Sequence, residues 1–221
     1  KDIIAIGANT GSRIRLQRRG NNFGAYINNS ALSGSALTGS TTITNGVWYH
    51  LMLIKSGTTF TLYVNTTSEA SGTFTGTFDS QEGIIGAYFG GGSGNINGSL
   101  SNVSIWNAAL TSSQITELYN EGKPSNLNNH SAYSNLVSWW QLGENSSFDG
   151  TNWTVLDEKG TNNGTSANMA EDDLVNGVGT SANGLSDGMG GADNIIGDAP
   201  YSTSNAVSYG MGVDALVNLT P

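Results

Sequence analysis

The amino-acid sequence predicts an all-β fold: a two-sheet antiparallel jelly-roll sandwich with one short helix and an extended, repetitive C-terminal tail. Three observations support this prediction. Charged residues make up only 11% of the 221 residues, while glycine alone numbers 31, and glycine and asparagine tolerate the positive backbone angles of tight turns. Short apolar segments separated by such turns fill the first half of the chain. A single segment carries the start and stop signals of a helix.

The strand-like segments follow one another without helical patterns between them. In the segment RIRLQ (13–17), Ile14 and Leu16 alternate with polar residues, which places both on one face of a strand. This spacing is typical of a sandwich or jelly roll and not of βαβ units. The predicted strands are 2–8, 13–19, 23–28, 48–56, 59–65, 72–79, 83–90 and 98–107.

One helix and one further strand are predicted after this region. Thr111 is expected to be the helix N-cap, with Gln114 completing a capping box, and Gly122 to be the C-cap before Pro124. The segment LVSWWQL (136–142) is typical of another strand.

The pattern predicts three regions: a sandwich at 1–122, a strand segment at 123–168 that completes or extends it, and a repetitive extended tail at 169–221. The tail repeats a pattern in which a methionine is followed by an acidic residue and an apolar pair. The three methionines are Met169, Met189 and Met211, and the period is about twenty residues. We expect these units to lie as extended segments on the sandwich or on a neighbouring subunit.

Charge and composition exclude several partners. The formal net charge is −9 and the pI is about 4.4, so nucleic acid is not an expected ligand. The one basic cluster has the alternation of a solvated strand face. It comprises Arg13, Arg15, Arg18 and Arg19. The sequence contains no apolar run of about 18 residues, so membrane insertion is not expected. The absence of cysteine excludes disulfides.

Two motifs resemble laminin-G-like domains of the concanavalin A-like lectin and glucanase superfamily. The hairpin WYHLMLIKSGTTFTLYVN (48–65) resembles the central hairpin of that family, and GSLSNVSIWNAALTSSQITELY (98–119) resembles its second signature. The motifs stand in the family's order and cover roughly half of the chain. The resemblance implies a jelly-roll fold.

The order of the remaining segments departs from the family's pattern. The family's two opening strands are missing before residue 2, whereas LVSWWQLGE and LDEKGTNNGT, near the end, resemble the family's usual beginning. An incomplete sandwich exposes an unpaired edge. The hypothesis is that the C-terminal segment fills the missing positions, either within the chain or in a neighbouring one.

Catalysis is not expected. Glucanases of this superfamily use alternate carboxylates on a Glu-x-Asp-x-x-Glu strand, which is absent from the sequence. His50 and His130 are too few for a metal site rich in imidazole, and neither is accompanied by a Gly-x-Ser-x-Gly elbow. The cluster Trp48-Tyr49-His50 is interpreted as sandwich core, with Trp48 and His50 on one face and Tyr49 on the other.

Two kinds of ligand site remain open. No cofactor is expected, but the resemblance leaves a calcium site at the rim of the sandwich open, with Asp79, Asp149 and Asp157 as its ligands; acidic loop residues are more often simply solvated. Sugar rings stack on exposed aromatic rings, and the same side chains also serve as core or edge cover. The candidate glycan-binding residues are Trp153, Trp139, Trp140 and Tyr88.

The composition and the methionine-containing tail resemble those of laminin-G-like proteins on virus particles of aquatic bacteria. This resemblance implies a non-enzymatic virion protein, of the capsid-decoration, head-fibre or tail-fibre kind, that is located on the virion or extracellularly. Its expected partners are other virion subunits or further copies of itself, bound through 167–221, and a host surface glycan. The alternatives are a secreted or cell-surface carbohydrate-binding module and a filament subunit that assembles by strand exchange.

Overall fold

The structure is a computed structural model that describes residues 1–7, 12–29, 32–75, 82–88, 95–143, 145–174 and 214–219. The chain divides into two compact units, Lys1–Gly98 with Val213–Pro221 and Ser99–Gly212. Within the described ranges the units are built mainly from antiparallel strands with a single α-helix, which confirms the predicted fold class. The predicted boundaries at 122/123 and 168/169 both fall inside the second unit.

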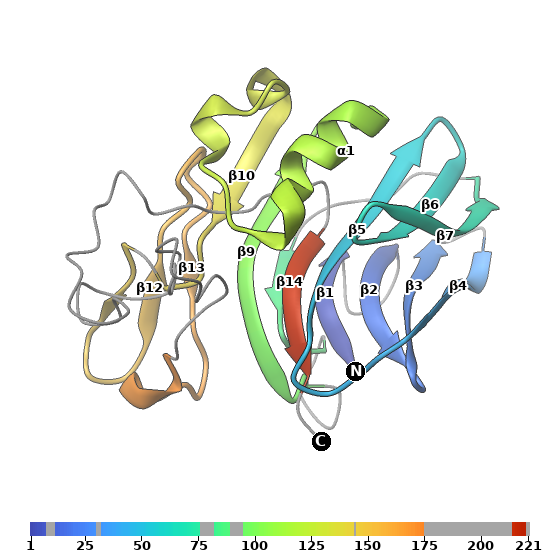
Figure 1. Ribbon diagram of the computed structural model, residues 1–221. Helices are drawn as coiled ribbons and strands as arrows, with labels where there is room; N and C mark the ends of the chain where they lie inside the picture. Colours follow the sequence, from blue (N-terminus) through green and yellow to red (C-terminus); the bar gives the residue numbers. More distant parts are fainter. Residues whose placement is uncertain are drawn as a thin grey trace. The chain divides into compact units, whose positions relative to one another are not determined.

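The first unit contains a five-stranded antiparallel sheet in the order β4-β3-β2-β1-β8, of which β1 to β4 are labelled in Figure 1. Its strands are β1 (Asp2–Gly7), β2 (Arg13–Arg19), β3 (Asn22–Asn29), β4 (Leu32–Thr42) and β8 (Glu82–Ile85). A tight turn joins β2 to β3 because the sequence supplies a glycine where the backbone needs it: Gly20 has φ +60°.

The strand order of the second sheet in this unit is β14-β5-β6-β7. Its strands are β5 (Trp48–Ser56), β6 (Thr59–Val64), β7 (Thr67–Thr73) and β14 (Asp214–Leu219). The strand at the end of the chain therefore pairs antiparallel with β5 (Figure 1). The last copy of the tail repeat lies in the sandwich of its own chain, one of the two locations expected for it.

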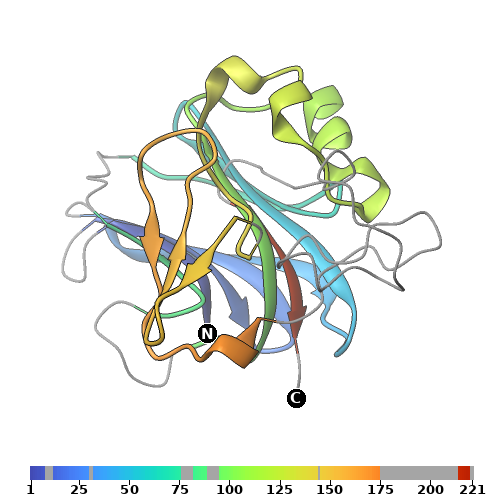
Figure 2. The same cartoon turned by 90° about the vertical axis from the view of Figure 1, so that its left-hand side faces the viewer.

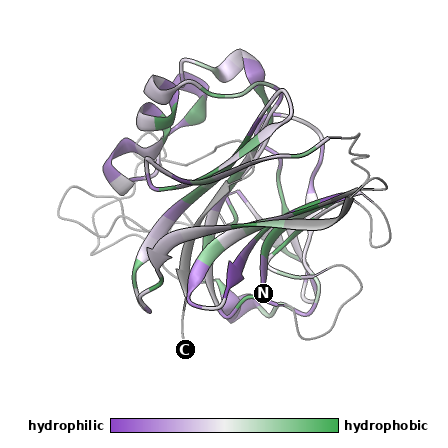
Figure 3. Ribbon diagram, turned by 90° about the vertical axis from the view of Figure 1, so that its right-hand side faces the viewer, coloured by the Kyte–Doolittle hydropathy of each residue, from purple (hydrophilic) through white to green (hydrophobic). Residues whose placement is uncertain are grey.

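The two sheets of the first unit enclose an apolar core. Phe23 of β3 meets Tyr49 of β5 edge to face, with ring centroids 5.0 Å apart and an interplanar angle of 62°. Hydrophobic and hydrophilic residues are interleaved along the strands in Figure 3, as expected for strands with one face inward. Each fully buried large side chain contributes about 1.5–3 kcal/mol. The buried apolar residues include Leu16, Phe23, Ala25, Ile27, Leu37, Leu51, Leu53, Phe60, Leu62 and Val64.

The Trp48-Tyr49-His50 cluster belongs to the core, as the sequence predicts. His50 has no exposed surface and Tyr49 is 8% exposed, while Trp48 is half-buried. Asn65 caps the hairpin: its side-chain oxygen accepts from the His50 backbone N–H at 3.1 Å, and its own N–H donates to the His50 carbonyl at 2.7 Å. The cluster is therefore a structural part of β5.

Two strands differ from the prediction. β4 was not predicted, because its sequence, LSGSALTGSTT, consists mostly of small and polar residues. β7 covers Thr67–Thr73 and shares only residues 72 and 73 with the strand predicted at 72–79, of which 76–79 lie outside the described residues. The Glu69 carboxylate of β7 accepts hydrogen bonds from the backbone N–H groups of Ser40 and Thr41 on β4 at 2.9 and 3.1 Å, and from the Thr41 hydroxyl. This clasp joins the two sheets where sequence hydrophobicity is weak.

In the second unit, β9 (Gly98–Trp106) pairs antiparallel with β10 (Leu136–Trp140). The predicted strand at 136–142 is thus paired within its own chain. It ends at Trp140, because Leu142 has a left-handed backbone with φ +61°. A register shift between Leu136 and Ser138 bends the strand.

The predicted helix forms as α1 (Ser112–Tyr119). Thr111 and Gln114 make the expected capping box, and Ile115 and Leu118 are buried. The predicted C-cap at Gly122 is wrong: Asn120 is the C-cap, in the left-handed conformation with φ +43°. Asn is the residue besides glycine that adopts this conformation most readily, since its side chain bonds locally; here the Asn120 amide donates to the Lys123 carbonyl at 3.2 Å.

Four 3-10 turns and a small sheet complete the second unit within the described ranges. The turns are Asn120–Gly122, Leu127–Asn129, Tyr133–Asn135 and Glu171–Asp173. The sheet consists of β11 (Ser147–Phe148), β12 (Trp153–Val155) and β13 (Gly164–Thr165), in that order, and is drawn in yellow to orange in Figure 2. None of the described helices is long and apolar enough to cross a membrane.

Candidate functional site

The candidate site lies on the polar face of β2 in the first unit. Antiparallel pairing places Arg15 opposite Ala5 of β1 and Tyr26 of β3. The Arg15 guanidinium carbon lies 4.3 Å from the centroid of the Tyr26 ring and 5.3 Å from that of Tyr88. The Arg13 guanidinium carbon lies 6.0 Å from the Tyr88 ring. We call Arg13, Arg15, Tyr26 and Tyr88 the arginine–tyrosine face.

A buried carboxylate holds this face in place. Arg15 Nη1 lies 3.2 Å from Asp2 Oδ2, and the two side chains are only 14% and 3% exposed. With its amide oriented to satisfy both neighbours, Gln17 donates to Asp2 Oδ1 at 3.2 Å and accepts from Arg19 Nη1 at 2.8 Å. Arg15 is therefore a paired, largely buried residue, which corrects the expectation that all four arginines are solvated.

The arrangement suits recognition of a ligand that offers both a negative charge and a ring. A guanidinium binds carboxylate or sulfate oxygens through its planar fork, and aromatic faces accept sugar rings. All four arginines of the chain lie on β2, although the whole chain carries −9. Arg13, Tyr26 and Tyr88 are half-buried, so part of each remains at the surface.

The predicted glycan residues occupy different parts of the molecule. Tyr88 belongs to the arginine–tyrosine face, whereas the three tryptophans lie in the second unit. Trp139 is 2% exposed and packs in the core, so its ring offers no free face. The indole of Trp140 donates to the Asn162 carbonyl at 2.7 Å, and that of Trp153 to the Ala170 carbonyl at 3.0 Å.

Trp153 is half-buried in the small sheet. Its ring contacts that of Phe148 across the β11–β12 pair, with centroids 5.3 Å apart. The rings thus form a small aromatic surface that is separate in sequence from the arginine–tyrosine face. The glycan prediction for Tyr88, Trp140 and Trp153 remains a prediction.

Asp157 organises the turn that follows β12. Its Oδ1 accepts from the backbone N–H groups of Trp139, Lys159 and Gly160 at 2.9, 3.1 and 2.9 Å, and its Oδ2 accepts from Asn162 N–H at 3.1 Å. Burial raises the pKa of the Asp157 carboxyl, but the hydrogen bonds, led by that from Gly160, outweigh this effect and hold the pKa below its ordinary value. In this structure the carboxylate is saturated by backbone donors.

The other acidic candidates are placed as follows. Asp149 is exposed and its Oδ1 accepts from Thr151 and Asn152 N–H at 2.8 and 2.7 Å, which closes an Asx turn. Those two backbone bonds lower the pKa of its carboxyl. Asp79 lies outside the described residues. The described part of the chain contains no group of three His, Asp or Glu side chains arranged to hold a metal ion, and the calcium prediction remains untested.

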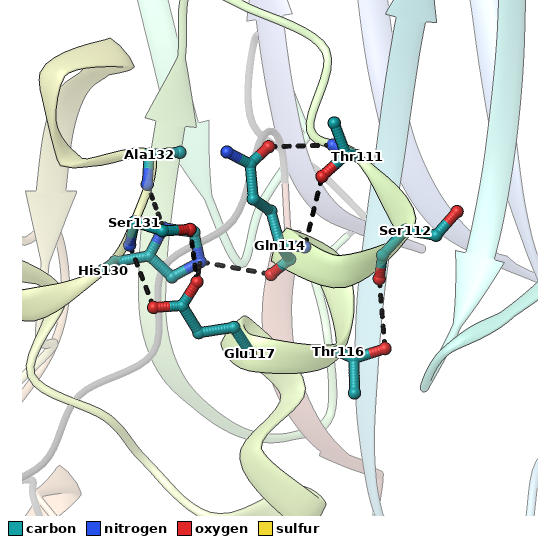
Figure 4. A network of polar contacts seen from close by, with 8 residues as sticks. All are labelled: Thr111, Ser112, Gln114, Thr116, Glu117, His130, Ser131 and Ala132. Carbon is teal, nitrogen blue, oxygen red and sulfur yellow. Dashed lines mark hydrogen bonds and ion pairs between the residues drawn. The ribbon is translucent and has the colours of Figure 1, made fainter.

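A polar network around His130 was not anticipated from the sequence (Figure 4). His130 Nδ1 accepts from Ala132 N–H at 3.0 Å, and Nε2 lies 3.1 Å from the Gln114 carbonyl. The Glu117 carboxylate accepts from the Ser131 N–H at 2.9 Å and from the Ser131 hydroxyl. These hydrogen bonds connect α1 to His130 and Ser131 in the segment that follows it.

The first unit, with its two sheets and the β5–β6 hairpin, has the architecture of a lectin-type domain. Residues 1–116 match the sequence profile of the concanavalin A-like lectin/glucanases superfamily. The chain belongs to this superfamily, and the resemblance carried by the two motifs is confirmed.

Comparison with curated proteins found no match. Among solved structures, an S-layer domain-containing protein from Clostridium thermocellum is similar at 22% identity and a TM-score of 0.31. The similarity covers 53% of this chain and 62% of that one, which is less than two thirds of that structure's length.

Proposed function

We propose that this chain is a non-enzymatic structural protein of a virion surface, of the capsid-decoration, head-fibre or tail-fibre kind. It displays a lectin-type sandwich that contacts host glycans. The observation that carries the binding role is the arginine–tyrosine face, where the Arg15 guanidinium lies 4.3 Å from the Tyr26 ring and 5.3 Å from the Tyr88 ring. The virion setting is supported by the low charge and the methionine-containing repeats of the tail.

The geometry of the two histidines supports a role in binding over one in catalysis. His50 has no exposed surface. His130 Nδ1 accepts from Ala132 N–H, and the adjacent Ser131 hydroxyl donates to Glu117 and not to the imidazole. A nucleophilic mechanism needs a base within hydrogen-bond reach of the nucleophile. His130 is committed to structural hydrogen bonds.

The glycan that best fits the arginine–tyrosine face is an acidic one. A uronic acid or a sulfated sugar offers oxygens to an arginine and a ring to a tyrosine. The charge of Asp2 is balanced by Arg15, and the Gln17 amide links Asp2 to Arg19. Three arginines, Arg13, Arg15 and Arg19, alternate along this face of β2.

A secreted or cell-surface carbohydrate-binding module is the second candidate. It is favoured by the half-buried Trp153 and its contact with Phe148, an aromatic surface of the size that a sugar ring covers. Such a module would bind its glycan through Trp153 and function without any particle.

A glycan array with and without calcium tests the binding role. We expect Tyr88→Ala to weaken binding to acidic glycans about tenfold or more, because the aromatic partner of both arginines is lost. Tyr63→Ala is the matched control, since Tyr63 is also half-buried but lies on β6. If Trp153→Ala abolishes binding and Tyr88→Ala does not, the site lies in the second unit. Binding that neither substitution changes would contradict both sites.

A further inference from the structure

The tail contains a sequence repeat in which one aspartate of each copy has a constant spacing. Asp172, Asp193 and Asp214 are spaced by 21 residues, and each is followed two and three positions later by an apolar pair. The pairs are Leu174-Val175, Ile195-Ile196 and Leu216-Val217. The chain therefore carries three copies of one short apolar segment, each with the length and β-branched residues of a strand.

The third copy is β14. It pairs with β5 over five residues, from Asp214 opposite Met52 to Asn218 opposite Trp48. The first copy begins differently, because Glu171–Asp173 forms a 3-10 turn. The same sequence pattern is thus a turn in one copy and a paired strand in another.

The backbone of β5 needs a hydrogen-bonded partner strand on the side where β14 lies. His50, Leu51 and Met52, which face β14, are fully buried. Backbone N–H and C=O groups in a buried strand must be paired, since each unpaired group costs a hydrogen bond without water to replace it. Pairing through the backbone depends on register more than on side-chain identity. Any copy of the repeat that keeps the register is therefore a suitable partner.

The chain length between the copies allows this partner to come from elsewhere. Thirty-nine residues lie between Leu174 and Asp214, and an extended chain of that length spans at most about 140 Å. A compact chain of this size has a radius of gyration of about 17 Å. Closing a long loop within one chain also costs conformational entropy, and a second chain at high local concentration competes with it.

We propose that the position beside β5 is an exchangeable strand acceptor, filled in trans by the Asp214–Leu219 strand of a second copy of this chain. The exchange links two copies through the β5–β14 pairing that one chain already forms with itself. It therefore needs no additional interface. It deepens the proposed structural role by naming the contact through which copies assemble.

Engineered cysteines test the exchange, because the chain has none of its own. Trp48→Cys chains are mixed with Asn218→Cys chains of different mass under mild oxidation, and the mixed disulfide is quantified on non-reducing gels. Trp48 and Asn218 are opposite partners in the β5–β14 register. We expect at least tenfold more mixed product than with Val217→Cys, because Val217 is opposite Tyr49 and not Trp48 in the register.

The proposal is overturned if Asn218→Cys gives no more mixed product than Val217→Cys while a chain carrying both Trp48→Cys and Asn218→Cys closes on itself.

A second measurement avoids any change in β5. A labelled peptide of residues 211–221 is added to full-length Leu216→Pro chain, in which proline prevents the chain's own strand from pairing. We expect the peptide to bind at least tenfold more tightly than it binds an Ile195→Pro chain, which keeps an intact third copy. Equal binding to both chains contradicts the exchange. Both assays use purified protein, so a negative result would contradict the strand exchange and not the proposed location on a particle. A result that contradicts the particle location would likewise not contradict the strand exchange.

Discussion

His50 is a titratable side chain in the centre of the first unit. Burial lowers the pKa of its imidazole to about 3, opposed only by a hydrogen bond with the Asn65 backbone. In the unfolded chain the ordinary value of 6.5 applies. Between these two values the unfolded chain binds a proton that the folded chain does not, so the free energy of unfolding falls as the pH falls from 6.5 toward 3.

The pH dependence of stability therefore depends on His50. We expect the free energy of unfolding to decrease by about 1.4 kcal/mol per pH unit in this window through His50 alone. Urea unfolding at several pH values between 4 and 7, compared with His50→Leu, checks this. The variant retains the smaller contribution of carboxyls with lowered pKa, such as Asp157, which is lost only at lower pH. Equal slopes for both proteins would contradict the assignment.

Gly160 is needed because of its neighbour Asp157. A Cβ atom at position 160 would lie 2.6 Å from Asp157 Oδ2 and 2.9 Å from the Val137 carbonyl, closer than real Cβ contacts. We expect Gly160→Ala to reduce the free energy of unfolding by about 1–3 kcal/mol. Chemical denaturation measures it. Gly83→Ala is the control, since a Cβ there meets nothing within 4 Å, and a similar loss in both variants would contradict the explanation.

Some of these residue roles could be predicted and others could not. The continuous apolar run of β5 around His50 and Tyr49 is enough to place both in the core. The acidic residue of an Asp-x-x-Gly turn is recognisable in the sequence, but whether its oxygens face backbone donors or an ion depends on the fold around it. The contact of Arg15 with Tyr88 joins residues 73 positions apart, and no local pattern encodes it.

At the scale of elements, the Glu69 clasp replaces missing hydrophobicity. β4 and β7 are mostly polar, and the clasp joins them through three hydrogen bonds to one carboxylate. We expect Glu69→Ala to reduce the free energy of unfolding by about 1–3 kcal/mol, because bonds to a charged acceptor are among the stronger ones. Thermal unfolding measures this loss. Glu121→Ala, at a side chain that is 87% exposed, should change little; a loss as large as that in Glu69→Ala would contradict the role of the clasp.

The elements that the sequence predicts well are those with continuous apolar runs, with apolar alternation or with specific caps. β1, β2, β5, β6 and α1 belong to this class. β4 was missed and β7 displaced because strand pairing there rests on backbone bonds and on the clasp, for which small polar side chains carry no periodic pattern. The helix C-cap moved from Gly122 to Asn120 because asparagine also adopts the left-handed conformation.

For the whole molecule, the two motifs of the first half identify the superfamily, and the profile match over residues 1–116 confirms it. The pairing partners of the later segments required the structure. The strand predicted at 136–142 pairs with β9, and the end of the tail pairs with β5. Long-range strand pairing depends on which edges remain open, and this is a property of the assembled sheets.

The central claim is that this lectin-type chain is displayed on a particle. Immunogold electron microscopy on the native source, with antibody raised against the purified chain, tests it most directly. We predict regular label over virus particles or their fibres. Label confined to soluble material or to cell surfaces would contradict the claim and favour a secreted or cell-surface carbohydrate-binding module.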